Sequence, residues 1–327
     1  MAILVTGAAG FIGFHVAQAL VGREEQVIGV DDLNDYYAPQ LKRDRLDLLK
    51  PLKGFSFHHA DIADAAFLDE IAARSEIKTV VHLAAQAGVR YSLENPFAYA
   101  RSNLLGHLSI LEMCRRLPSL QHLVYASSSS VYGTTTQTPF REDARADAPV
   151  SLYAATKRAD ELMSAAYADL YDLPQTGLRF FTVYGAWGRP DMAYWSFTEA
   201  ILKGRPVQIF NNGDMRRDFS YIDDVVAGVL GVIDHPPADS EGAGHDPHRI
   251  LNIGANRPEP LMRFIAVLEE ATGREAEKVF LPMQPGDVYE TYADTTAIEA
   301  LCSFSASTPI EEGLPLFVDW FRSYHDL

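Results

Sequence analysis

The sequence is poor in positive charge. Its 28 Lys and Arg residues face 44 Asp and Glu residues, so the formal net charge is −16 at pH 7. A chain this acidic is repelled by the phosphates of nucleic acids and by anionic membrane surfaces. We therefore expect neither nucleic acid nor a membrane as a partner. An anionic ligand would need a local group of basic side chains.

Cysteine and long hydrophobic runs are also scarce. Cys114 and Cys302 are the only two cysteines, too few for a disulfide framework, which fits a reducing, cytoplasmic compartment. No apolar run approaches the ~20 residues of a membrane span, and the N-terminus lacks the basic segment of a signal peptide. His235, His245 and His248 share a polar stretch that we interpret as a surface loop. They lack metal-ligand spacing, so no metal site is predicted.

The N-terminal segment follows a pattern typical of dinucleotide binding. The apolar run Ala2–Thr6 predicts a strand, and Gly7-Ala-Ala-Gly10-Phe-Ile-Gly13 predicts a turn that opens a helix. These glycines allow a tight turn, a close approach of the backbone to a pyrophosphate, and close packing of helix on strand. A glycine turn without a ligand is the disfavoured alternative. The predicted cofactor contacts here are Gly7, Gly10, Phe11, Ile12 and Gly13.

Acidic residues end the second predicted strand. Asp31 and Asp32 follow it about 20 residues after the glycine turn, where an acid hydrogen-bonds the adenosine ribose. Two acids would repel a 2′-phosphate, which favours NAD over NADP. The basic residues nearby, Lys42, Arg43 and Arg45, are interpreted as the solvated face of a helix, with contact to the cofactor or a partner subunit as the alternative.

The next strands continue the same alternation with helices. Asp61 and Ile62 follow the third strand and are expected at the adenine rim, although Asp61 could also cap the next helix. The fourth strand runs into Ala84 and Ala85, which are small enough for a cofactor to pass close by. Strands and helices that alternate at this pace predict a parallel, doubly wound sheet with ligands at the carboxyl ends of the strands.

Hydroxyl groups gather after the fifth predicted strand. The run Ser127–Ser130 places four hydroxyls at its carboxyl end. Some of them can cap their own turn, but this does not explain all four. We expect Ser128 to hydrogen-bond a substrate hydroxyl, with Ser129 and Ser130 lining the pocket.

Tyr153 and Lys157 lie four residues apart, so on a helix they share one face. A nearby ammonium group favours the phenolate form of a tyrosine. Such a tyrosine can take a proton from a substrate hydroxyl while a hydride leaves the same carbon. An ordinary amphipathic helix would explain the spacing alone. The predicted NAD site and the upstream serines favour the catalytic interpretation.

Two further polar residues stand near the predicted pocket. Arg90, in the loop after the fourth strand, is either an anion contact or a surface residue. Asn103, within a predicted helix over 95–117, is either solvated or positions the backbone at a strand end.

Taken in order, these motifs resemble the extended short-chain dehydrogenase/reductase superfamily. Within it the chain is similar to the NAD-dependent nucleotide-sugar epimerases and dehydratases, and most to the UDP-glucuronate 4-epimerase group. The stretches that carry this resemblance are Val30–Tyr37, Gln86–Ser92, Trp187–Trp195, Asn211–Asp214 and Gln284–Val288.

The resemblance implies an isomerase that holds NAD and catalyses no net redox reaction. Tyr153 would take the proton of the sugar 4-hydroxyl while C4 gives its hydride to NAD. The 4-keto sugar would then rotate about its diphosphate link, and the hydride would return to the opposite face of C4. Ser128 would share the hydrogen-bond network of that hydroxyl, and Lys157 would bind the nicotinamide ribose and favour the phenolate. UDP-glucuronate and UDP-galacturonate would be interconverted.

The same resemblance implies the substrate contacts. Thr182 would face the sugar, Arg217 would hold the diphosphate, and Asp287 would lie near the uridine end. For the sugar carboxylate, which needs a local cation in so acidic a chain, we favour Arg189, with Arg90 second.

Four other functions remain possible on the same fold. UDP-glucuronate decarboxylases and sugar dehydratases of the superfamily carry an acid where this chain has Ser130, which counts against both. The decarboxylase is the runner-up because it shares the substrate and the cofactor. An epimerase of neutral UDP-hexoses would share the cofactor and the mechanism. A non-catalytic NAD-binding regulator is disfavoured by the intact Ser128, Tyr153 and Lys157.

The predicted fold is α/β. We expect a Rossmann-type NAD-binding domain at residues 1–181, with 217–255 crossing back onto it. Residues 182–216 and 256–327 would form a smaller nucleotide-sugar-binding α/β domain. The helices predicted over 95–117 and 152–170 would pair with their copies in a homodimer, as is common in the family.

Overall fold

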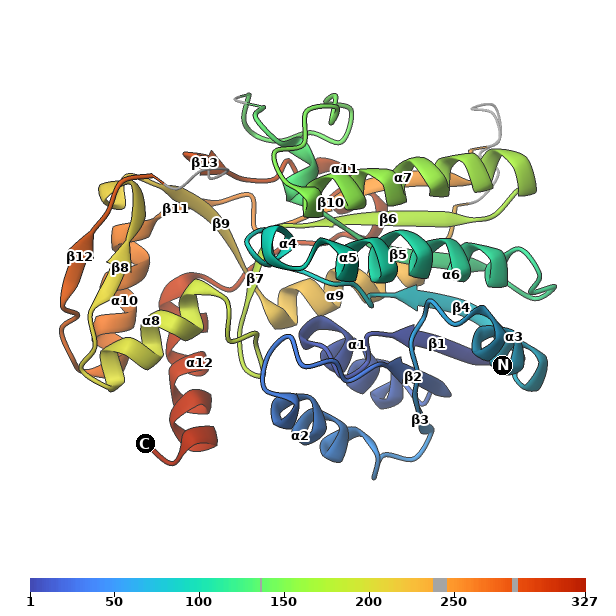
Figure 1. Cartoon of the computed structure of the whole chain (residues 1–327), viewed down its shortest axis with the longest axis horizontal. Coiled ribbons are helices and arrows are strands. Elements are labelled where there is room, and N and C mark those ends of the chain that lie inside the picture. Colours follow the sequence, from blue (N-terminus) through green and yellow to red (C-terminus); the bar gives the residue numbers. More distant parts are fainter. Residues whose placement is uncertain (136, 238–245, 284–287) are drawn as a thin grey trace.

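The computed structural model describes residues 1–135, 137–237, 246–283 and 288–327. Its centre is a seven-stranded sheet in the order β10-β6-β5-β4-β1-β2-β3, with every neighbouring pair parallel (Figure 1). This confirms the predicted doubly wound sheet. The strands are β1 (Ala2–Thr6), β2 (Val27–Asp31), β3 (Phe55–His59), β4 (Ile77–His82), β5 (His122–Ser128), β6 (Gln175–Phe180) and β10 (His248–Ile253).

Alternating side chains of the strands fill two hydrophobic layers, as the period of a strand requires. In β1, Leu4 packs with Ile110 on one face, whereas Ile3 packs with Phe14 and Val229 on the other. Helices α3 (Ala65–Arg74), α6 (Gly106–Cys114) and α7 (Leu152–Tyr171) cover the first face. Helices α1 (Phe11–Gly22), α9 (Ile222–Ile233) and α11 (Thr296–Cys302) cover the second, with α2 (Pro39–Leu49) against α1.

The sheet order reverses at β1. The chain runs outward from β1 to β2 and β3, then returns to the other side of β1 as β4. Open α/β sheets bind ligands at such a switch point, beyond the carboxyl ends of the strands. The fold therefore places the site above β1, β4 and β5.

The helix predicted over 95–117 is interrupted. The segment contains α5 (Pro96–Tyr99), a π-helical turn η1 (Ala100–Leu105) and then α6, and the short helix α4 (Tyr91–Glu94) precedes it. Asn103 lies in η1 and is 1% exposed, so the solvated interpretation was wrong. Its Oδ1 accepts from the Gln86 backbone N–H at 2.8 Å, and its Nδ2 donates to the Thr156 Oγ1 at 2.9 Å. Asn103 thus positions the backbone after β4, which was the alternative.

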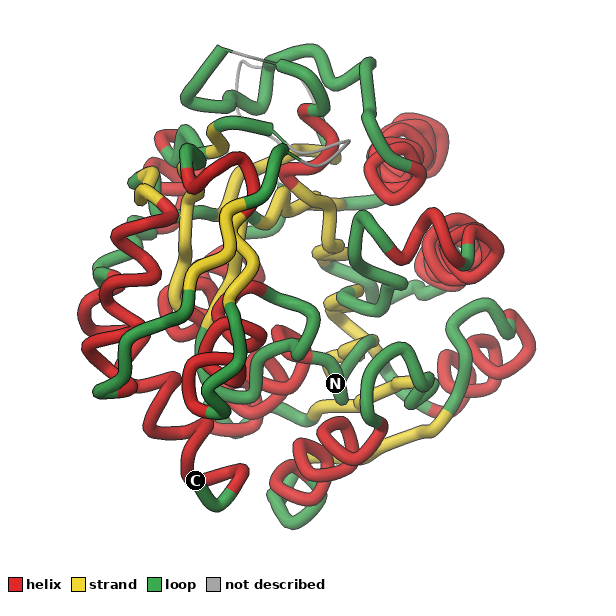
Figure 2. The backbone as a smooth tube through the Cα atoms, turned by 60° about the vertical axis from the view of Figure 1, so that its left-hand side comes forward, coloured by secondary structure: helices red, strands yellow, loops and turns green. Residues whose placement is uncertain are grey.

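A second group of elements stands beside the main sheet (Figures 1 and 2). Its strands form two further sheets, one ordered β11-β9-β13 with β7 beside β9, and one pairing β12 with β8. The strands are β7 (Thr182–Tyr184), β8 (Val207–Ile209), β9 (Arg216–Tyr221), β11 (Pro258–Pro260), β12 (Lys278–Phe280) and β13 (Glu290–Thr291). The remaining helices are α8 (Ala193–Leu202), α10 (Leu261–Thr272) and α12 (Ile310–His325), and two 3-10 turns are η2 (Ser129–Tyr132) and η3 (Phe210–Gly213).

The surface-loop prediction for the three histidines is wrong for one of them. His248 begins β10, where its Nε2 lies 2.8 Å from the Tyr125 hydroxyl. His235 ends the α9 region with its Nδ1 2.7 Å from the Gly231 carbonyl oxygen. His245 lies outside the described residues. Across the described ranges, no cluster of His, Cys, Asp or Glu has a metal-binding arrangement, and no helix is long and apolar enough to span a membrane.

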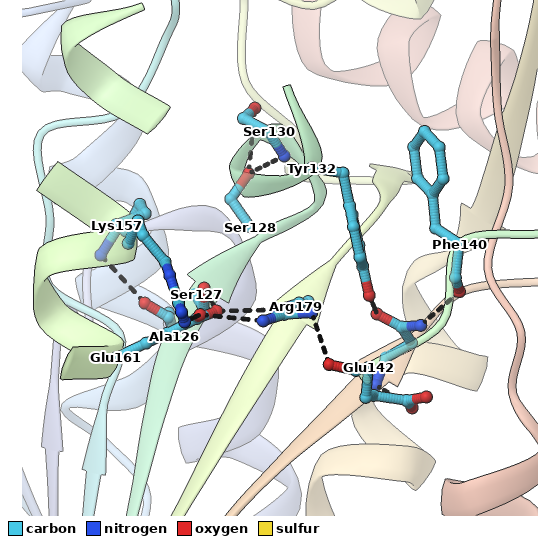
Figure 3. A network of polar contacts seen from close by, with 12 residues as sticks. Ala126, Ser127, Ser128, Ser130, Tyr132, Phe140, Glu142, Lys157, Glu161 and Arg179 are labelled. Carbon is cyan, nitrogen blue, oxygen red and sulfur yellow. Dashed lines mark hydrogen bonds and ion pairs between the residues drawn. The ribbon is translucent and has the colours of Figure 1, made fainter. Parts of the chain in front are cut away.

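A buried ion pair ties α7 to the main sheet (Figure 3). Arg179 of β6 binds both carboxylate oxygens of Glu161 at 2.8 and 2.9 Å, and both residues are 2% exposed. Ser127, at the end of β5, donates to the same carboxylate at 2.6 Å. One carboxylate therefore holds two strands and a helix together.

Replacing Glu161 by Ala would leave the Arg179 guanidinium buried without its carboxylate. We expect the free energy of unfolding to fall by about 3–5 kcal/mol, measured by urea denaturation. Glu70→Ala is the matched control, because the Glu70–Arg74 pair on α3 is exposed, and it should cost less than about 1 kcal/mol. Equal losses in the two variants would contradict the role given to the buried pair.

Candidate active site

A cavity of about 780 Å³ opens at the carboxyl ends of the strands. The structure brings almost all of the predicted site residues to its wall. Those that line it are Gly7, Gly10, Phe11, Ile12, Gly13, Asp31, Asp61, Ile62, Ala84, Ala85, Arg90, Ser128, Ser129, Ser130, Tyr153, Lys157, Thr182 and Arg189. Arg217 is not on this wall, and Asp287 lies outside the described residues.

The glycine turn has the shape that a bound diphosphate requires. Gly7 has φ +72°, and a Cβ there would lie 2.7 Å from the Ala84 nitrogen. A Cβ on Gly13 would lie 2.1 Å from the Gly7 carbonyl oxygen. No side chain caps the N-terminus of α1, so its first N–H groups remain available to an anion at the cavity wall. The turn therefore fits a dinucleotide cofactor.

Asp31 is held in place by the backbone around it. Its carboxylate accepts from the N–H groups of Ala9 at 3.1 Å and Leu33 at 2.9 Å. Burial raises the pKa of Asp31, and the Lys42 ammonium 3.7 Å away opposes that rise. The residue sits in the cavity wall at the end of β2, where an adenosine ribose would meet it.

The solvated interpretation of the α2 basic residues was wrong for two of the three. Lys42 is 5% exposed and Arg45 is 0% exposed, whereas Arg43 is exposed. The reason is that α2 buries Leu41, Leu46 and Leu49 on the same side, and the two long stems pack with them. Lys42 lines the cavity, so the alternative of a contact near the cofactor is the one that the structure supports.

Asp61 is not the cap of α3. Asp64 caps that helix, because its carboxylate accepts from the N–H groups of Ala66 and Phe67. The Asp61 carboxylate instead binds Arg101 at 2.7 Å and lines the cavity. If Asp61 contacts the adenine, it does so while its carboxylate is paired with Arg101.

Helix α7 presents Tyr153 and Lys157 to the cavity. Ser151 starts the helix by accepting from the Ala154 N–H at 3.1 Å, which places Tyr153 in the first turn and Lys157 in the second. Lys157 is 3% exposed, and its Nζ donates to the Ala126 carbonyl oxygen at 2.9 Å and to Asp160 at 3.2 Å. Burial raises the pKa of Asp160 to about 7 although Lys157 lowers it. Asp160 was not anticipated from the sequence.

The serines at the end of β5 and just after it divide between two tasks (Figure 3). The Ser127 hydroxyl donates to Glu161. The Ser128 hydroxyl accepts from the Ser130 N–H and donates to the Ser130 hydroxyl, both at 3.2 Å. Turn capping is therefore real for Ser128, and it also fixes the two hydroxyls side by side at the cavity wall.

Arg189 is already paired across the cavity wall. Its guanidinium binds Asp191 at 2.5 and 3.0 Å, and the Tyr36 hydroxyl donates to the same carboxylate at 3.1 Å. Burial opposes ionisation of Asp191, but the Arg189 charge outweighs it and lowers the pKa of Asp191. Arg90 is exposed and stacks over the Phe210 ring at 5.2 Å.

Sequence reasoning missed Tyr36 and Asp191 as site residues. Both lie in the stretches that carried the family resemblance, which was the available signal. Arg217 was expected at the diphosphate, but the structure places its guanidinium on the carbonyl oxygens of Val288 at 2.7 Å and Tyr289 at 3.0 Å.

Comparisons with known proteins agree with this geometry. A probable UDP-glucuronate 4-epimerase of Rhizobium meliloti (strain 1021) is 46% identical over 331 residues, which cover 98% of this chain and 97% of the relative. The solved UDP-glucuronic acid 4-epimerase of Bacillus cereus, in complex with UDP-glucuronic acid and NAD, superposes with a TM-score of 0.90 at 32% identity, over 99% of this chain and all of that one.

A solved UDP-glucose 4-epimerase of Thermotoga maritima, with UDP-glucose, also superposes, with a TM-score of 0.86 at 30% identity over 99% of this chain and 100% of that one. Residues 3–254 match the profile of the NAD dependent epimerase/dehydratase family. The chain therefore belongs to the NAD dependent epimerase/dehydratase family.

Proposed function

We propose that this protein is an NAD-dependent 4-epimerase that interconverts UDP-glucuronate and UDP-galacturonate. The observation that carries the proposal is the composition of one cavity wall. It joins a dinucleotide turn to Tyr153, Lys157 and Ser128, in a chain that matches a UDP-glucuronic acid 4-epimerase over almost its whole length. NAD, when bound, supplies a reversible hydride acceptor.

The residues at the glycine turn would hold the cofactor. The uncapped N-terminus of α1 would bind its diphosphate, and Asp31 would bind the adenosine ribose. Lys157 already donates to a carbonyl oxygen at the end of β5 and would reach the nicotinamide ribose from there. Ala84 and Ala85 leave room for the cofactor to pass.

Tyr153 would move the proton. Its phenol oxygen would take the proton of the sugar 4-hydroxyl as the C4 hydride leaves, which produces the 4-keto sugar. After the 4-keto sugar has rotated, Tyr153 would return the proton to the same oxygen while the hydride returns to the opposite face of C4. The substrate regains both, so there is no net oxidation. Ser128 would hold the 4-oxygen throughout.

The other end of the cavity would read the sugar carboxylate and the nucleotide. Ser129, Ser130 and Thr182 line the wall, and Arg189, which lines it too, is the proposed cation. Because Asp191 already neutralises part of the Arg189 charge, the arginine can orient a carboxylate without binding it too tightly to turn over. We retain Arg217 and Asp287 as proposed contacts of the diphosphate and uridine.

The acids of the wall disfavour a decarboxylase. The carboxylates that line the cavity, within the described residues, are Asp31, Asp32, Asp61 and Asp191. The first three belong to the expected adenosine end, and Asp191 is paired with Arg189. Ser130 stands where the decarboxylases that the sequence resembles carry an acid. The described wall therefore offers no carboxylate that is unpaired beside Tyr153.

We also propose two features of organisation. Residues 1–181 with 217–255 would form the NAD-binding domain, and 182–216 with 256–327 the nucleotide-sugar-binding domain; the separate small sheets support this division. The chain would act in the cytoplasm as a homodimer. Large apolar side chains that are exposed on α5, η1 and α7 support a dimer contact there, namely Phe97, Leu105, Leu162 and Leu170.

The proposed reaction can be tested directly. Purified protein incubated with UDP-glucuronate, without added reductant, should form UDP-galacturonate, resolved by NMR or chromatography. Tyr153→Phe should lower kcat by at least about 100-fold, because it removes the proton acceptor. A pentose product would make the enzyme a decarboxylase, and turnover of UDP-glucose alone would make it an epimerase of neutral sugars. Near-normal turnover by Tyr153→Phe would refute the role of the tyrosine.

Arg189→Met tests the carboxylate contact. We expect kcat/KM for UDP-glucuronate to fall about 10- to 100-fold, since a hydrogen bond to a charged group is lost, while UDP-glucose turnover changes by less than about threefold. Arg43→Met is the matched control and should spare both substrates, because Arg43 is exposed and is not on the cavity wall. An equal loss for both sugars in Arg189→Met would show that Arg189 does not read the carboxylate.

The homodimer can be tested on α7. Leu162 is 56% exposed, and Leu162→Glu should convert the dimer to a monomer in light-scattering chromatography, because it places a charge in an apolar contact. Leu48→Glu on α2, where Leu48 is 45% exposed, is the control and should leave the dimer intact. A wild-type monomer would contradict the proposal outright.

A further inference from the structure

Arg45 is fully buried and uses all five of its N–H donors. Its Nη1 donates to the carbonyl oxygen of Ala9 and to the Tyr37 hydroxyl, both at 2.8 Å. Its Nε and Nη2 donate to the Trp187 carbonyl oxygen at 3.1 and 2.7 Å. Nη2 also donates to the Gly188 carbonyl oxygen at 2.9 Å. Three carbonyl groups from two distant segments thus converge on one guanidinium.

No carboxylate pairs with this charge within the described part of the chain. Every hydrogen-bond partner of Arg45 is a neutral carbonyl or phenol. Burying an arginine without a counter-ion is costly, and an apolar side chain would fill the same space more cheaply. An arginine offers five N–H donors in a fixed plane, which a lysine does not, and all five are bonded here.

The two segments that Arg45 joins belong to the two halves of the cavity. Ala9 lies within the glycine turn, between Gly7 and Gly10, which both line the cavity. Trp187 and Gly188 immediately precede Arg189, whose own N–H donates to the Tyr194 hydroxyl at 2.9 Å. A Cβ on Gly188 would lie 2.1 Å from that same hydroxyl, so this backbone has little freedom to shift independently.

Two neighbouring contacts also reach the 186–191 segment. His15 of α1 lies 2.9 Å from the Ala186 carbonyl oxygen, and burial lowers its pKa to about 4, which keeps it neutral at pH 7. Tyr36, on the segment that leads into α2, donates to Asp191. These two contacts also join the cofactor half to the 186–191 segment, but of the three residues only Arg45 binds both the backbone of the glycine turn and the 187–188 backbone.

We propose that Arg45 is a positioning residue that couples cofactor binding to nucleotide-sugar binding. A ligand that orders the glycine turn fixes the Ala9 carbonyl, and through the guanidinium it fixes the backbone that carries Arg189. By linkage the effect is reciprocal, so a ligand in the sugar site must hold the cofactor more tightly. This inference rests on the proposed function, because it assumes a UDP site beside the cofactor.

The test measures NAD release from the holoenzyme, with and without saturating UDP. In the wild type we expect UDP to slow release by about 10-fold or more. In Arg45→Met the UDP effect should shrink to within about twofold, whatever the basal rate of release. Arg43→Met is the matched control, since Arg43 is exposed on the same helix, and it should keep the wild-type response. A merely structural role would alter the basal rate but not the response to UDP.

The outcomes separate the two proposals. If calorimetry shows no UDP binding to the wild type, the proposed function fails. If UDP binds but leaves NAD release unchanged, or if Arg45→Met keeps the full response, the inference is wrong and the function stands. Should Arg45→Met not fold, Arg45→Lys keeps the charge without the planar donors and should lose the response. Hydrogen exchange of the wild type adds a variant-free check, because UDP should slow exchange at residues 7–14 as well as 186–192.

Discussion

The carboxylate of Glu161 fixes the geometry on which the rest of the site depends. Lys157 and Glu161 are one turn apart on α7, and Tyr153 lies one turn before them on the same face. By binding Arg179 of β6 and Ser127 of β5, Glu161 sets both the height and the rotation of the helix. Successive residues of a strand face opposite sides of the sheet. Because Ser127 points to Glu161 of α7, Ser128 points to the other side, and it lines the cavity.

Several basic side chains are buried close to the proposed site although the chain as a whole is strongly acidic. The chain carries −16, yet Lys42 and Lys157 are buried at the wall of one cavity, and Arg45 is buried against the Ala9 and Trp187 backbone. Lys42 and Lys157 are each held by a neutral oxygen and a carboxylate: Lys42 by the Asn34 amide and Asp31, and Lys157 by the Ala126 carbonyl and Asp160. The Arg45 guanidinium is held by three carbonyl groups and a phenol. Neutral oxygens stabilise a cation without cancelling its field, so the Arg45 charge is less compensated than the charges of Lys42 and Lys157.

Sequence patterns predicted the sheet, the glycine turn and the Tyr153–Lys157 pair because each depends on local periodicity or on one short motif. They failed where tertiary packing decides. Lys42 and Arg45 read as solvated, since only the fold shows which face of α2 meets α1 and the 187–188 backbone. The π-helical turn around Asn103 was equally invisible, because its hydrogen bonds to Gln86 and Thr156 join segments 17 and 53 residues away.

The same anchoring decides which part of the site moves during the proposed reaction. Inverting C4 requires the 4-keto sugar to present its other face to the cofactor. The 186–191 backbone is bound to the NAD-binding half through Arg45, His15 and Tyr36, so it cannot swing with the sugar without breaking several hydrogen bonds. In the proposed reaction the rotation would therefore occur about the bonds of the substrate's own diphosphate link. Arg189 and Tyr153 would remain fixed while the sugar takes its two orientations.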